Sequence, residues 1–250
     1  MINIFRGTFS ETINIRNLLE NINIQVFTEN ENMTNIEPWA ISSGGFNPII
    51  LKVKAEDFEN AKKLIEDFEN GILNQETLKF PIGHFTKPDS ISENDIQNWI
   101  ETIEMFPLKL KNTVSNLSVE ELNWTYRPDG WKIKQVIHHC ADSHINSFVR
   151  FKLAITEDNP TIKPYDEAKW ATLIDGDCDD ILTSLLILEG IHARWTMLLK
   201  SFDTADLAKT FTHPESKKTY ELKEVIGLYA WHCKHHFAHI EQALLYKGKF

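Results

Sequence analysis

The 250-residue chain lacks any apolar run long enough to cross a membrane, and its amino terminus has no signal-type apolar core. It is also short of basic residues: 26 Lys and Arg stand against 36 Asp and Glu, for a formal net charge of −10. Without a basic stripe to neutralise phosphates, nucleic acid is not an expected partner. We expect a soluble, cytoplasmic protein that binds neither membranes nor nucleic acid.

Cysteine is scarce as well. Cys140, Cys178 and Cys233 show no C-x-x-C spacing, which argues against a disulfide framework and against an all-cysteine zinc site. Aromatic residues are plentiful, with 7 Trp and 15 Phe in a chain that is 42 % hydrophobic. This composition is typical of a globular protein rather than a disordered one, and the length suits one large domain or two small ones.

Residues 1–70 are predicted to form a small α+β domain of ferredoxin-like type. A polar loop with Gly44 and Gly45 precedes its last strand. Its predicted elements are strands at 2–5, 24–27 and 49–53, a helix capped by Ser10, and a helix with Glu56 and Asp57 in its first turn. No nucleophile, metal-ligand spacing or phosphate-binding loop is found here, so this domain suggests binding or regulation rather than catalysis.

Residues 71–79 are predicted to be a linker, and residues 80–250 an all-α four-helix bundle. Four amphipathic segments carry this prediction: one that begins at Ser92, one at 131–156, one at 179–202 and one at 221–246. Pro107 is expected to kink or interrupt the first. Residues 158–177 hold two prolines and little helical period, which predicts a long ordered crossover loop.

The last of these helices concentrates histidine. Four of the ten histidines fall within eight residues: His232, His235, His236 and His239. His232 and His236 are one helical turn apart and form half of a metal site, whereas His235 is predicted to point away. His236 lies near the middle of an apolar stripe, where a desolvated imidazole needs a partner. The competing interpretation is a solvated, histidine-rich helix face.

A catalytic metal site usually has three protein ligands, so this pair requires a third. The helix at 131–156 offers His139 and His144. His144 belongs to the apolar stripe of that helix, and His139 to a polar strip with Asp142 and Asn146. Periodicity alone does not choose between them.

Several motifs of this region occur together and in order. They are Phe80-Pro81-Ile82-Gly83, Asp129-Gly130-Trp131, Ile137 through Ser147, Pro164 through Glu167, and Tyr229 through Ile240. Residues 80–250 thereby resemble the YfiT branch of the DinB superfamily. The resemblance implies a four-helix bundle that holds one divalent metal ion per chain, Zn²⁺ or Ni²⁺, through His139, His232 and His236. Cys140 stands where the family usually has an aliphatic residue.

Four further side chains are candidates for catalysis or for holding the ligand imidazoles: Asp142, His144, Asn146 and His239. For His144 and His239 a buried, hydrogen-bonded core position is the favoured interpretation over a role as ligands, whereas Asp142 is explained equally well as a solvated carboxylate. The resemblance implies a metal-dependent enzyme that transfers a low-molecular-weight thiol, such as bacillithiol, to electrophilic small molecules. The alternatives are a hydrolase of an amide or ester that uses metal-activated water, and a non-catalytic metal-dependent sensor. A homodimer stays open.

The first domain carries a resemblance of its own. The pattern Ile4-Phe5-x-Gly7-Thr8, then Leu18-Leu19-Glu20-Asn21, Gly44-Gly45 and Val53-x-x-Glu56-Asp57 resembles the prokaryotic signal transducing domain. This resemblance implies a role in sensing or in recruiting a partner.

Overall fold

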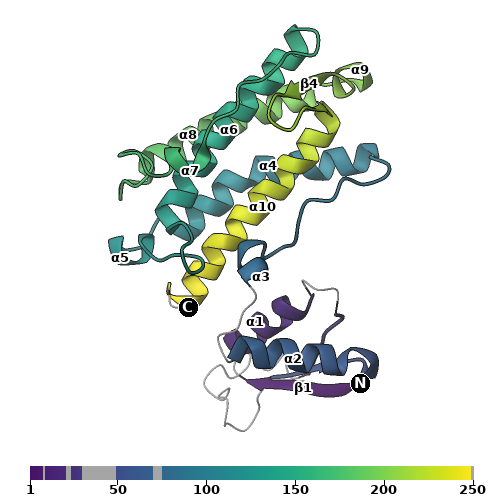
Figure 1. The fold of residues 1–250 in the computed structure, drawn as a ribbon, viewed down its shortest axis with the longest axis vertical. Coiled ribbons are helices and arrows are strands. Elements are labelled where there is room, and N and C mark those ends of the chain that lie inside the picture. Colours follow the sequence, from purple (N-terminus) through teal and green to yellow (C-terminus); the bar gives the residue numbers. More distant parts are fainter. Residues whose placement is uncertain (8, 21–23, 30–48, 70–74, 249–250) are drawn as a thin grey trace. The chain divides into compact units, whose positions relative to one another are not determined.

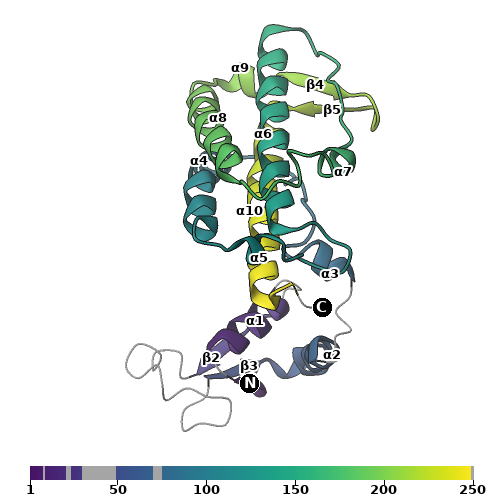
Figure 2. The same ribbon diagram turned by 90° about the vertical axis from the view of Figure 1, so that its left-hand side faces the viewer.

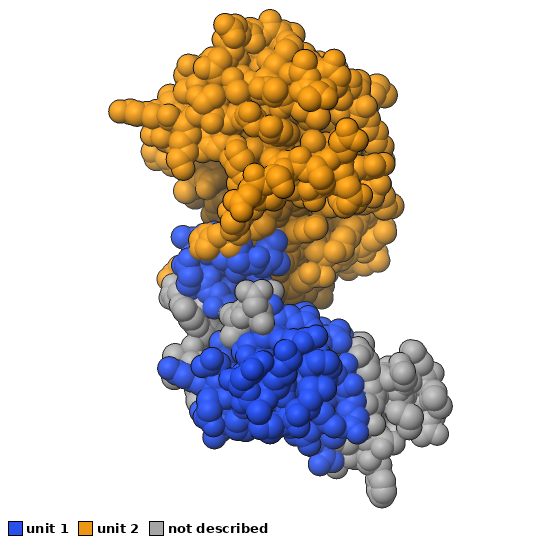
Figure 3. Space-filling model, turned by 90° about the vertical axis from the view of Figure 1, so that its right-hand side faces the viewer, with its two compact units in different colours: residues 1–83 blue, residues 84–250 orange. Residues whose placement is uncertain are grey.

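The chain divides into two compact units, residues 1–83 and 84–250, each with its own hydrophobic core (Figure 3). The computed structural model describes all residues except 8, 21–23, 30–48, 70–74 and 249–250. The predicted Gly44-Gly45 loop and the first part of the predicted linker lie outside the described residues. The rest of that linker is helical, as α3 (Gln75–Lys79). The predicted boundaries of the two functional domains, residues 1–70 and 80–250, stay a prediction.

The first unit is α+β, as predicted. Its elements are β1 (Ile2–Gly7), α1 (Phe9–Glu20), β2 (Phe27–Glu29), β3 (Ile49–Val53), the 3₁₀ turn η3 (Ala55–Asp57) and α2 (Phe58–Glu69). The strands form an antiparallel sheet in the order β1-β3-β2. β2 begins where the predicted strand 24–27 ends, because Ile24 belongs to the core and not to the ladder.

Four long helices build the second unit, as predicted (Figures 1 and 2). They are α4 (Glu93–Val114), α6 (Ile133–Thr156), α8 (Leu182–Lys200) and α10 (Leu222–Tyr246). The contacting pairs are α4–α8, α8–α6, α6–α10 and α10–α4. The first two long helices of the chain, α4 and α6, therefore lie at diagonally opposite corners of the bundle. This arrangement sets α6 directly against α10. Among the helices of the described residues, none combines the length and the hydropathy that a membrane span requires.

The first bundle helix begins at the predicted cap and passes through its proline. Ser92 and Asp95 form a capping box, with Asp95 N donating to Ser92 Oγ at 3.2 Å. Pro107 lies inside α4 and lacks the N–H that would bond the carbonyl of Ile103, four residues earlier. That carbonyl accepts a hydrogen bond from His192 Nδ1 instead, at 2.6 Å. α4 is therefore continuous through Pro107.

Several short elements of the second unit were not predicted. They are α5 (Val119–Leu122), α7 (Glu167–Trp170), α9 (Thr204–Leu207) and an antiparallel hairpin of β4 (Thr210–His213) with β5 (Lys218–Glu221). The four-helix bundle is as predicted, and this hairpin adds two short strands that the all-α prediction did not include. β5 leads directly into α10, so the hairpin sits at the start of the helix that carries the histidine cluster.

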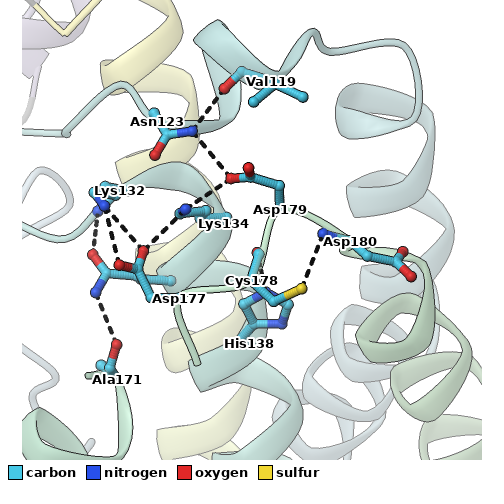
Figure 4. Close-up of polar contacts among 11 residues, drawn as sticks. Val119, Asn123, Lys132, Lys134, His138, Ala171, Asp177, Cys178, Asp179 and Asp180 are labelled. Carbon is cyan, nitrogen blue, oxygen red and sulfur yellow. Dashed lines mark hydrogen bonds and ion pairs between the residues drawn. The ribbon is translucent and has the colours of Figure 1, made fainter. Parts of the chain in front are cut away.

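The crossover loop is tied to the amino-terminal end of α6 (Figure 4). Lys134, whose side chain is only 6 % exposed, lies 3.1 Å from Asp177 and 2.7 Å from Asp179. Lys132 reaches Asp177 at 3.0 Å, and His138 Nε2 lies 2.9 Å from the carbonyl of Cys178. These contacts order the loop, as the sequence predicts, beside the turn of α6 that carries His139.

Candidate metal centre

The interface between α6 and α10 brings together the three histidines that the resemblance implies. His139 comes from α6, and His232 and His236 face it from successive turns of α10. One nitrogen from each ring lies within 4.8 Å of the other two. The ring centroids are 5.5 Å apart for His139 and His232, 4.7 Å for His139 and His236, and 4.3 Å for His232 and His236. Their assignment as ligands stays a prediction.

A second histidine group on α10 shares His236. His235, His236 and His239 also offer nitrogens within 4.8 Å of one another. His235 lies outside the group of His139, His232 and His236, but it is not on a solvated face: only 6 % of it is exposed, and its ring stacks on Trp231 at 4.4 Å. The reason is that α10 packs against several elements and is buried on more than one side. His239 is buried and stacks on Tyr126 at 3.8 Å.

The three facing histidines fit a divalent ion. A metal binds only neutral imidazole. Burial lowers the pKa of His139 to about 4, and it holds the pKa values of His232 and His236 well below 6.5. His236 Nδ1 is buried without a hydrogen-bond partner among the described residues. Ionisation therefore does not compete with metal binding at neutral pH.

Among the predicted supporting residues, His144 contacts a predicted ligand directly. Its Nε2 lies 3.1 Å from His232 Nδ1, and its Nδ1 lies 2.7 Å from His192 Nε2. The Asn146 amide donates to the backbone carbonyl of Asp142 on the same helix, at 2.9 Å. Partial burial raises the pKa of the Asp142 carboxyl. His144 is thus both a buried core histidine and a partner of the site.

Hydroxyl groups that sequence reasoning missed lie beside His232. Ser143 Oγ is 3.4 Å from His232 Nε2 and 3.4 Å from the Tyr229 hydroxyl. Burial raises the pKa of Tyr165, and the nearby Ser143 hydroxyl acts in the opposite direction. Helical spacing could have found two of them, since Ser143 is one turn after His139 and Tyr229 one turn before His232. The Tyr165 ring also lies 4.5 Å from the Trp170 ring, in a tilted arrangement.

A carboxylate and an indole flank His139. Glu167 Oε2, from α7 in the crossover loop, lies 4.0 Å from His139 Nε2. Desolvation raises the pKa of Glu167, and the neighbouring Asp166 adds to the effect. The Trp131 ring lies 4.7 Å from the His139 ring. Nothing in the helical period of α6 or α10 could have indicated Glu167, because the loop brings it from elsewhere in the chain.

Residues 107–240 match the family model of the DinB superfamily. The chain belongs to this superfamily. A Bacillus mycoides protein named as a candidate metal-dependent hydrolase is 51 % identical over 163 residues, which cover 65 % of this chain and 93 % of that protein. A Bacillus thuringiensis protein of the same description is 50 % identical over equal shares.

A solved structure agrees with this DinB assignment. YfiT from Bacillus subtilis, described as a metal-dependent hydrolase candidate with an unusual four-helix bundle topology, is 42 % identical to this chain. The match has a TM-score of 0.65 and covers 68 % of this chain and 97 % of YfiT. The resemblance of residues 1–70 to the prokaryotic signal transducing domain stays a prediction.

Proposed function

We propose that this protein is a metal-dependent enzyme that transfers a low-molecular-weight thiol, such as bacillithiol, to electrophilic small molecules. The observation that carries the proposal is the charge of the predicted ligands, because burial keeps His139, His232 and His236 neutral at pH 7. A divalent ion held by neutral ligands keeps its full charge and lowers the pKa of a thiol or water that binds to it. The names of the relatives support metal dependence.

The surroundings of the three histidines suit a thiol substrate. Ser143, Tyr165 and Tyr229 offer hydroxyl groups, and the raised pKa of Tyr165 keeps it protonated. Such groups donate hydrogen bonds and orient a substrate, but they are poor bases. A thiol needs little help from a base, since its pKa of about 8.5 is already close to neutral. In the reaction the sulfur–carbon bond forms, the leaving group departs, and the thiol proton passes to solvent or to Glu167.

The free thiols of the bundle do not favour a closed structural metal site. Cys140 and Cys233 both belong to the hydrophobic core, and burial raises the pKa of each thiol. Only the thiolate is a good metal ligand. A coordination position open to substrate is therefore favoured over a fourth protein ligand, and with it an enzyme over a sensor.

Hydrolysis of an amide or ester is the second candidate, and Glu167 is the observation that favours it. Its carboxylate oxygen lies 4.0 Å from His139 Nε2. A carboxylate with a raised pKa beside a metal ligand is suited to take a proton from an attacking water. The relatives are also named as hydrolase candidates.

A conjugation assay separates the two functions. Zn²⁺-loaded and Ni²⁺-loaded protein would be mixed with a fluorogenic alkyl halide and with bacillithiol, cysteine or glutathione in turn. We expect conjugation to require both the metal and the added thiol. The His236→Ala variant, which lacks one predicted ligand but keeps Glu167, should lose this activity. Turnover of a simple ester at equal rates with and without thiol, and no conjugation, would instead assign the hydrolase function.

A further inference from the structure

A chain of hydrogen bonds leads from the backbone of α4 to the predicted ligand His232. His192 Nδ1 lies 2.6 Å from the Ile103 carbonyl, the one that Pro107 leaves without a helical donor. His192 Nε2 lies 2.7 Å from His144 Nδ1, and His144 Nε2 lies 3.1 Å from His232 Nδ1. All four long helices thus contribute to one line of contacts that ends at the candidate metal centre.

The two middle rings are enclosed by protein. His144 is 0 % and His192 is 1 % exposed. The Phe106 ring lies 5.5 Å from His144 and 5.6 Å from His192, and the Trp195 ring lies 5.9 Å and 5.8 Å from them. Because these neighbours are aromatic, the hydrogen bonds of the chain are the polar contacts that satisfy both imidazoles.

The direction of every bond in this chain follows from its carbonyl end. A carbonyl oxygen can only accept, so His192 Nδ1 carries the proton and, in a neutral ring, His192 Nε2 accepts. His144 Nδ1 must then donate, which leaves His144 Nε2 as the acceptor for a proton on His232 Nδ1. The enclosure of both middle rings by protein favours the neutral imidazoles that this scheme requires.

We propose that His192 and His144 are positioning residues that fix the tautomer of His232, so that its Nε2 carries a lone pair and not a proton. The role of this tautomer in metal binding rests on the proposed function, whereas the hydrogen bonds themselves do not depend on it. In the metal-free protein, Ser143 Oγ lies 3.4 Å from His232 Nε2 and can donate to that lone pair. A ligand imidazole that is held through its other N–H has a fixed orientation and a higher basicity.

The tautomers are measurable without any metal. Full-length, metal-free protein with ¹⁵N-labelled histidine would be studied at pH 7 by long-range ¹H–¹⁵N correlation. Variants that each replace one histidine would assign the signals. We expect the Nδ1–H form for His192, His144 and His232 alike. A protonated Nε2 on His232 would overturn the proposal. Since this result needs neither metal nor substrate, it stands apart from the outcome of the conjugation assay.

Variants at the far end of the chain test the effect on metal binding. His192→Phe keeps a ring of similar size but removes the acceptor for His144, so we expect Zn²⁺ affinity to fall about 10-fold by calorimetry, within the range for such outer partners. His192→Gln can donate to Ile103 and accept from His144, and it should restore most of the affinity. If His192 had only a structural role, the two variants would bind Zn²⁺ with equal affinity whenever their free energies of unfolding were equal.

His138→Phe is the matched control. His138 is also a buried histidine of α6, with Nδ1 2.8 Å from Ser184 Oγ and Nε2 2.9 Å from the Cys178 carbonyl, but it stands outside the chain to His232. We expect it to lower stability while the His232 tautomer and the Zn²⁺ affinity stay as in the parent protein. If His192→Phe leaves both unchanged, the proposal is wrong; if His192→Phe does not fold, the tautomers of the parent protein decide.

Discussion

At the residue scale, replacing each of two adjacent histidines of α10 tests metal binding and packing separately. His236 is common to both histidine groups, so His236→Ala should remove the bound ion. His235→Ala leaves the facing set intact and should keep one ion per chain, but it removes a buried ring that stacks on Trp231. We expect that loss to lower the free energy of unfolding by about 3 kcal/mol, as for other buried aromatic truncations. Metal analysis and urea denaturation measure the two effects.

A second pair of variants decides between the two groups. His139→Ala should lose the ion, whereas His239→Ala should retain it, since His239 belongs only to the group along α10. If metal analysis found the reverse, the ion would be held by His235, His236 and His239 rather than at the interface of α6 and α10.

Spacing along the sequence predicted the pair His232 and His236, because two side chains one turn apart must share a helix face. Periodicity could not choose between His139 and His144, and the structure shows why: both are buried, at 4 % and 0 % exposure. A helix buried on most sides has no single apolar stripe. For the same physical reason His235 is buried although it lies off the predicted apolar stripe.

The crossover loop makes a testable connection at the element scale. Lys134 joins α6 to Asp177 and Asp179 at the end of the loop (Figure 4). The same loop carries Glu167 in α7. Lys134→Ala should lower the free energy of unfolding by about 1 kcal/mol, a modest cost because both carboxylates are partly exposed. Hydrogen exchange should increase across residues 158–179 but not in α10. Unchanged exchange in the loop would show that other contacts hold it.

Long elements were predictable and short ones were not. The four bundle helices follow from caps such as Ser92 and from apolar periodicity over several turns. The β4–β5 hairpin was missed because each strand has four residues, too few for a pattern of alternation to stand out. Glu167 reaches His139 only through contacts between residues far apart in sequence, which no local pattern records.

Independence of the second unit is the prediction at the scale of the whole molecule. Its core cluster and all three predicted ligands come from residues 96–244. A chain of residues 80–250 should therefore fold and bind one metal ion, with the helical content expected for the bundle. A soluble fragment that fails to hold metal would mean that residues 1–79 contribute to the site.

Acid stability tests the burial of the histidines as a set. Burial lowers the pKa of His139, His192 and His235 to about 4, whereas in the unfolded chain each returns to about 6.5. Between these values the unfolded state binds protons that the folded state does not. The free energy of unfolding of metal-free protein should therefore fall from pH 6.5 toward pH 4, by up to about 1.4 kcal/mol per pH unit for each such histidine.

Well above pH 6.5 these histidines become neutral in both states, so their contribution to the slope should vanish. Urea denaturation with chelator present, at pH 7.5, 6 and 5, measures the curve, and His235→Ala should reduce its slope by about 1.4 kcal/mol per pH unit. Metal loss on acidification should then coincide with loss of helical signal, because the folded ligands stay neutral well below 6.5. Release of the ion near pH 6.5 from a protein that remains fully folded would show instead that solvent reaches these imidazoles.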